Sequence, residues 1–158
     1  RYRELDNEKV YYSEDYRNFV LNHRSALNSL AEALIDEGQM EKANTVLEFS
    51  TTKMPDRVIA YDHTTATLVD LLFKVGQKEK ALEIAKLLGD RAEEMALYLV
   101  EENYGLSQEL RKNIFILNAL QQTLYENGEM ELGKKYEDAF NSLLTSLQMG
   151  SSGQPGQY

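Results

Sequence analysis

The chain contains no cysteine, no tryptophan and only two prolines among its 158 residues. Without cysteine it cannot form a disulfide, use a thiol nucleophile or bind zinc through thiolates. This absence leaves the compartment open, because chains without cysteine occur on either side of a membrane. The scarcity of proline favours long helices, since proline removes a helical hydrogen bond and clashes with the preceding turn.

Basic residues and long apolar runs are also lacking. The 17 Lys and Arg residues stand against 26 Asp and Glu, which gives a formal charge of -9. Nucleic acid and anionic lipid both attract basic surfaces, so neither is an expected partner. Apolar runs such as Ala96 to Val100 are far below the ~20 residues of a membrane span, so we expect no membrane insertion by this segment. No signal peptide opens the chain, which begins at Arg1-Tyr2-Arg3 and is expected to be part of a longer protein.

What the sequence does contain is apolar residues at helical spacing in six successive segments. The predicted helices cover about residues 16–37, 40–53, 64–75 (with Asp62 or Thr64 as cap), 78–103, 107–127 and 130–147. The predicted inward residues are, in the first helix, Phe19, Val20, Leu27, Leu30, Ala31, Leu34 and Ile35 and, in the second, Ala43, Val46, Leu47 and Phe49. Gly89 interrupts the fourth helix and is expected to bend it. Residues 1–15 are expected to form an extended lead-in, residues 16–148 a helical repeat domain, and residues 149–158 a flexible tail.

Three of the interhelical segments share one local signature. A glycine is followed five residues later by a small residue, and leucines precede the glycine by four and by eight residues. The glycines are Gly38, Gly76 and Gly128, the small residues Ala43, Ala81 and Gly133, and the leucine pairs Leu30/Leu34, Leu68/Leu72 and Leu120/Leu124. Glycine permits a tight turn between antiparallel helices, and the small residue lets the second helix approach the first. Because one hairpin cannot bury its apolar face alone, we expect the hairpins to stack.

This signature resembles the tetratricopeptide (TPR) family, in which a turn glycine, a small residue five later and a closing proline recur. Pro55, seventeen residues after Gly38, matches the closing proline. The resemblance implies an all-α fold, an α-α superhelix of about three hairpins and six main helices. The spacing departs from the family, because the turn glycines are 38 and 52 residues apart rather than the usual 34. The second and third repeats also lack the closing proline.

A more specific resemblance involves longer stretches. Segments 1–3, 16–34, 53–56 and 61–62 are similar to the C-terminal region of a family of large membrane proteins from Bacteroidetes and relatives, whose multi-pass part resembles protein O-mannosyltransferases. The resemblance implies that this chain is the end of a membrane glycosyltransferase-like protein and lies outside the cytoplasmic membrane, on the periplasmic side. Catalysis would then belong to the membrane part, and no catalytic residue carries over.

The titratable residues do not form a recognisable catalytic or metal motif. His23 and His63 are the only histidines, and no His-Glu-x-x-His pattern contains them. The adjacent acids at 36–37, 93–94 and 101–102 point about 100° apart on a helix, so each pair is expected to be a solvated surface. No glycine-rich loop follows a strand. We therefore expect no catalytic, metal or cofactor-binding residues.

The TPR resemblance does imply a binding surface, because the first helix of each hairpin in that family lines a concave groove. The matching positions are Asn28, Glu32, His63, Asp70, Phe73, Asn118, Gln122 and Tyr125. They form a polar, slightly acidic set with two aromatic anchors, which suits a neutral or basic peptide. His63 also follows Asp62 at a helix start, where a capping or surface role is the simpler interpretation.

Two functions follow from these observations. The first is a non-catalytic interaction module that binds a protein or peptide partner or its own membrane domain. The alternative is an accessory domain that positions an acceptor polypeptide or glycan for a membrane transferase. A stand-alone hydrolase is disfavoured, because no nucleophile and base stand in a recognisable motif.

Overall fold

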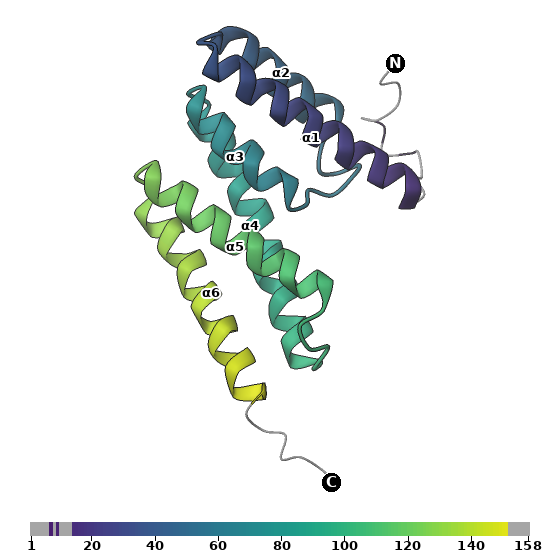
Figure 1. Cartoon of the computed structure of the whole chain (residues 1–158), viewed down its shortest axis with the longest axis vertical. Coiled ribbons are helices and arrows are strands. Elements are labelled where there is room, and N and C mark those ends of the chain that lie inside the picture. Colours follow the sequence, from purple (N-terminus) through teal and green to yellow (C-terminus); the bar gives the residue numbers. More distant parts are fainter. Residues whose placement is uncertain (1–6, 8, 10–13, 152–158) are drawn as a thin grey trace. The chain divides into compact units, whose positions relative to one another are not determined.

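The computed structural model describes residues 7, 9 and 14–151, and these residues contain six helices and no strand (Figure 1). The helices are α1 (Glu14–Asp36), α2 (Met40–Lys53), α3 (Thr64–Lys74), α4 (Lys78–Glu101), α5 (Gln108–Glu126) and α6 (Met130–Ser151). The prediction of an all-α fold of six helices is confirmed. The bounds agree closely with the sequence, except that α1 begins inside the expected lead-in and α6 extends into the expected tail. The remainder of both segments lies outside the described residues.

The three repeated glycines form the turns that join consecutive helices. Gly38, Gly76 and Gly128 have φ values of 74°, 81° and 80°, a region that only glycine enters without steric cost. In each turn the residue after the glycine donates its N–H, over 2.7 to 2.8 Å, to the carbonyl of the leucine four before the glycine. These bonds satisfy helix-end carbonyls in the Schellman arrangement. The predicted positions of the turns are therefore confirmed.

The small residue after each turn stands where the two helices of a hairpin meet. Ala43 and Ala81 are completely buried. At Gly133 an added Cβ atom would stand 2.9 Å from the ring of Tyr125 on α5, closer than real Cβ contacts. A larger side chain at these positions would therefore separate the paired helices.

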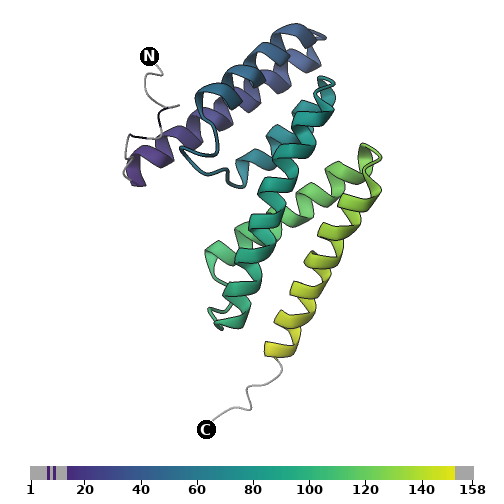
Figure 2. The ribbon, with the colours of Figure 1, turned by 180° about the vertical axis from the view of Figure 1, so that it is seen from behind.

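The chain divides into two compact units, Arg1–Ile84 and Ala85–Tyr158, and the division falls inside α4. In the first unit, α1 packs against α2 and α3, and α2 also contacts α3. In the second unit, α5 and α6 pack side by side, as both views show (Figure 2). The single repeat domain over residues 16–148 stays a prediction.

The inward face of α1 matches the predicted one only in part. Val20 and Ala31 are buried as predicted, whereas Leu30 is 49% exposed and Phe19 is exposed as well, so the expectation that these two face inward is wrong. The buried residues of α1 are Val20, Arg24, Asn28 and Ala31, spaced by four, four and three. Phe49 of α2, also predicted inward, is exposed. The stripe differs because α1 packs part of its length on the segment after α2, where Met54 and Ile59 join Val20 in one apolar cluster.

Gly89 has a packing role that the sequence did not reveal. An added Cβ atom there would stand 2.3 Å from the ring of Tyr136, which comes from α6 and is completely buried. Because glycine has no side chain, α4 has a notch at Gly89 into which the Tyr136 ring packs.

Candidate functional site

The eight predicted groove residues are divided between the two units. Asn28, Glu32, His63, Asp70 and Phe73 belong to the first unit, and Asn118, Gln122 and Tyr125 belong to the second. Within each unit they differ in exposure and in bonding, so they do not all offer their side chains to a partner.

The first unit has an acidic face on α1 and α3. Glu32 and Asp36 are exposed on α1, and Asp70 on α3 forms an ion pair of 2.8 Å with Lys74. The hydrogen bond that Lys74 donates to Asp70 raises the pKa of Lys74, and the charges of Glu32 and Asp36 raise it further. Phe73, half-buried, adjoins this lysine in the sequence. We call Glu32, Asp36, Asp70 and Phe73 the acidic face. Its three carboxylates outnumber the one adjoining cation, Lys74.

Asn28 is not available to a partner, because it is buried beside Arg24. Its Nδ2 donates to the carbonyl of Thr64 over 2.9 Å. Arg24, only 2% exposed, donates to the carbonyls of Met54 and Ala60, at 2.8 and 3.0 Å, and also to that of Ile59. Arg24 therefore attaches α1 to the segment that follows α2, and Asn28 attaches it to the first residue of α3.

Arg24 is charged although it is buried. Burial lowers its pKa, while the nearby Tyr61, Asp62 and Asp56 raise it. The ring of Tyr61 lies 4.9 Å from the guanidinium carbon, in cation–π geometry. Arginine keeps its proton in proteins, so carbonyl dipoles and a ring face compensate a full positive charge here.

His63 lies immediately before α3, where Asp62 organises the helix start. The Oδ1 atom of Asp62 accepts from the backbone N–H and the hydroxyl of Thr64, at 3.1 and 2.7 Å. His63 Nδ1 stands 3.3 Å from the other carboxylate oxygen, and its side chain is exposed. Asp62 thus satisfies a free N–H group at the helix start, as the sequence predicted.

The three positions in the second unit lie on α5. Gln122 is exposed, and Asn118 is half-buried with its Oδ1 accepting from Gln121 at 2.9 Å. The Tyr125 hydroxyl donates to Glu137 of α6 over 2.8 Å, and this hydrogen bond raises the tyrosine pKa. Because its ring also covers Gly133, Tyr125 contributes to the α5–α6 contact.

A polar network connects α4 and α6 in the second unit. The Tyr136 hydroxyl donates to Asp90 Oδ1 over 2.9 Å, and Lys135 Nζ is 2.6 Å from the same oxygen and 3.5 Å from Glu93. Burial would raise the pKa of Asp90, but the bonds from Lys135 and Tyr136 outweigh burial and lower it. Burial, followed by the bond to Asp90, raises the pKa of Tyr136.

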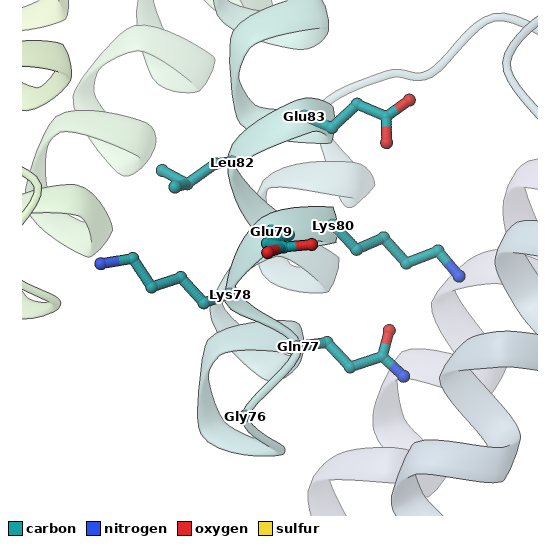
Figure 3. A pocket seen from close by; sticks show the side chains of 7 residues that line it. All are labelled: Gly76, Gln77, Lys78, Glu79, Lys80, Leu82 and Glu83. Carbon is teal, nitrogen blue, oxygen red and sulfur yellow. The ribbon is translucent and has the colours of Figure 1, made fainter.

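Each unit has a hollow among the described residues. One, of about 730 Å³, is lined by the single segment 76–83 at the start of α4 (Figure 3). There Gln77 donates to Glu48 of α2 over 3.2 Å, while Lys78 and Leu82 extend to the other side of the helix (Figure 3). The second, of about 390 Å³, lies between α4 and α6 and is lined by Glu93, Leu97, Lys135, Asp138, Ala139, Ser142 and Leu143. Only the second has walls from two helices.

Neither a metal site nor a membrane span is found in the residues that the structure covers. No three His, Asp or Glu side chains among them converge as metal ligands would. None of the helices there is both long and apolar enough to cross a bilayer.

Sequence reasoning missed Arg24 and the Tyr136 network. Arg24 stands at the spacing of buried residues, four after Val20 and four before Asn28, so its position in the apolar stripe was the available signal. No such signal marks the contact of Tyr136 with Gly89, which joins residues far apart in the chain. Comparison with protein families, curated proteins and solved structures gave no match to this chain.

Proposed function

We propose that the chain is a TPR-like interaction module that binds a neutral or basic peptide of a protein partner. The acidic face of the first unit is the observation that carries this proposal. Glu32 and Asp36 are exposed and form no ion pair among the described residues, and Phe73 offers a partly exposed ring beside Lys74. Unpaired acids near an aromatic ring attract a cationic peptide and provide apolar contact area.

The proposal uses only part of the predicted groove. Asn28 and Tyr125 have structural partners, so their replacement would disturb packing rather than test binding. In the first unit, Glu32 and Phe73 are the groove positions whose side chains can change without breaking a described hydrogen bond or ion pair, and the same holds for Asp36, which lies outside the predicted groove.

A displayed library of random peptides offered to the purified chain tests this function. We expect the enriched peptides to be neutral to basic and to lose enrichment on the Glu32→Gln/Asp36→Asn and Phe73→Ala variants. Glu126→Gln/Glu131→Gln is a matched control, since it removes the same charge from two exposed acids that belong to neither the acidic face nor the predicted groove. Failure to enrich any peptide, or enrichment that ignores the acidic-face variants, would overturn the proposal.

We further propose that the module belongs to a longer membrane glycosyltransferase-like protein and lies on the periplasmic side. The support is the resemblance of segments 1–3, 16–34, 53–56 and 61–62. Sequencing the gene upstream of Arg1 tests it, because many apolar runs of about 20 residues should precede this chain. A gene without such runs would leave only the interaction module.

In that longer protein the acidic face would position an acceptor polypeptide for the transferase. Cells carrying Glu32→Gln/Asp36→Asn should then show less glycosylated acceptor at unchanged transferase abundance. Equal glycosylation in cells carrying the parent protein and the variant would contradict this role.

A further inference from the structure

The second unit has an exposed apolar surface on the last turns of α4 and the loop that follows. It consists of Met95, Leu97, Tyr98, Tyr104 and Leu106, which we call the outer patch. All five are exposed, Tyr98 by 50% and Tyr104 by 60%. Large apolar side chains that gather in this way usually mark an interaction site.

The outer patch lies away from the core-facing side of α4. The buried side of this helix carries Ala85, Leu88, Ala92, Ala96 and Leu99. At 100° per residue, Leu97 and Tyr98 lie roughly 140° and 120° from the centre of that stripe, on opposite sides, and Met95 lies roughly 60° from it on the side of Tyr98. In this half, α4 is therefore apolar around most of its circumference, as helices covered on more than one side are.

The loop holds its part of the patch in a defined conformation. Asn103 and Gly105 have φ values of 56° and 62°, and the N–H of Tyr104 donates to the Leu99 carbonyl over 3.1 Å. The ring centroids of Tyr98 and Tyr104 are 6.3 Å apart. Arg111 Nε donates to the Leu106 carbonyl over 3.2 Å. The two rings thus form a preorganised pair, which reduces the entropic cost of binding.

Charge around the patch indicates the chemistry of its partner. Glu94, Glu101 and Glu102 are exposed, and none forms an ion pair within the described range. The last turn of α4 carries no basic residue, although the helix dipole is negative at this end. Arg91 precedes the patch on α4, and Arg111 follows it and donates to the Leu106 carbonyl. Acids at a negative helix end repel one another, and a cationic partner would relieve that repulsion.

We propose that the outer patch docks a basic, amphipathic segment of a partner protein. A guanidinium or ammonium group stacks on the Tyr98–Tyr104 pair and faces Glu101 and Glu102. An apolar side chain of the same segment enters the 390 Å³ hollow beside Leu97. This surface is separate from the acidic face, and the inference does not depend on the proposed function.

A site-resolved experiment tests this surface. The probe is a synthetic peptide of alternating Arg and Leu residues that carries a photo-crosslinking group, with a Glu–Leu peptide as counterpart. We expect the basic probe to crosslink within residues 93–106 and the acidic one not to. Tyr98→Ala/Tyr104→Ala and Glu101→Gln/Glu102→Gln should each reduce that crosslink roughly tenfold, the usual effect of removing central aromatic or charged contacts.

The matched control separates local from general attraction. Glu32→Gln/Asp36→Asn removes equal charge and should leave the crosslink at 93–106 unchanged, with circular dichroism confirming that every variant is folded. Crosslinks on α1 and α3 alone would overturn the outer patch while supporting the acidic face. If Glu32→Gln/Asp36→Asn and Glu101→Gln/Glu102→Gln reduce the crosslink at 93–106 equally, the attraction is unspecific, and the outer patch is overturned as well. Concentration-dependent dimerisation that Tyr98→Ala/Tyr104→Ala abolishes would assign the patch to a second copy instead.

Discussion

At the scale of single residues, Arg24 is the side chain on which the first unit depends most. Its guanidinium supplies hydrogen bonds to carbonyls of the segment between α2 and α3. Replacement by methionine keeps most of the stem but leaves those carbonyls without a donor. Since each unsatisfied buried group costs about 1–3 kcal/mol, we expect Arg24→Met to lower the free energy of unfolding by roughly 3 kcal/mol. Urea denaturation followed by circular dichroism measures this change.

Lys112→Met removes an exposed cation and serves as the control for Arg24→Met, with an expected change below about 0.5 kcal/mol. Equal stability of the two variants would mean that water satisfies the carbonyls and that Arg24 does not fasten the segment.

Gly89 reverses the usual effect of glycine in a helix. Replacing an interior glycine by alanine normally stabilises a helix by about 1 kcal/mol. Here the new methyl group would collide with the ring of Tyr136, so we expect Gly89→Ala to destabilise the chain by roughly 1–3 kcal/mol. Thermal denaturation of Gly89→Ala, Tyr136→Leu and the double variant provides the measurement. Because Tyr136→Leu removes the ring, alanine at position 89 no longer collides with it. The double variant should therefore lose less stability than the sum of the two single variants. Strict additivity would contradict the packing of Tyr136 against Gly89.

Residue-level roles could be predicted only where neighbours in the sequence create them. Ala43 and Ala81 were identifiable as contact residues because a glycine five positions earlier fixes the turn. The partnership of Gly89 with Tyr136 spans 47 residues, and nothing local marks it. The burial of Leu30 was predicted wrongly for a related reason. Leu30 has the spacing of the repeat, but the buried face of α1 contains Arg24 and Asn28 instead.

At the scale of helices, the sequence predicted ends better than partners. Glycine at three turns stops each helix by local backbone geometry, and the start of α2, α4 and α6 follows two residues later. The end of α4 was placed two residues too late, because Asn103 takes the left-handed conformation there instead of glycine. Which face of a helix is buried depends on distant segments, such as the one containing Met54 and Ile59.

The contact of α4 with α6 depends on pH through Asp90. Its pKa is lower in the folded chain than in the unfolded one, so the stabilisation is complete above the unfolded value near about 4 and is lost as pH falls through the folded value. Asp90 is partly exposed, so Asp90→Asn should cost only about 1 kcal/mol at neutral pH. The gap between parent and variant should close in acid, as measured by urea denaturation across pH.

Asp138→Asn is the comparison for Asp90→Asn, because Asp138 pairs with Lys134 on the surface of α6 and both side chains are well exposed. A smaller loss at neutral pH is expected there. A gap between the parent chain and Asp90→Asn that is equally wide at acidic and neutral pH would contradict the role assigned to the carboxylate charge.

At the scale of the whole molecule, the distribution of charge decides which partners are possible. The net charge is -9, and some of the acidic residues form ion pairs while others do not. Glu32 and Asp36 in one unit, and Glu94, Glu101 and Glu102 in the other, have no salt-bridge partner in the part of the chain described. The composition predicted an acidic module, but it could not show which acids lack an ion-pair partner, because that depends on folding.

Binding of a basic partner should consequently depend strongly on ionic strength. The Debye length falls from about 10 Å at 0.1 M salt to about 3 Å at 1 M, so attraction by these exposed acids is screened over that range. We expect the Kd of a basic amphipathic peptide, measured by fluorescence anisotropy, to rise roughly tenfold or more. A peptide with glutamine in place of each basic residue should bind weakly and show little change. If the basic peptide binds equally well at both salt concentrations, apolar contact alone carries recognition, and the excess acids serve only to keep the chain in solution.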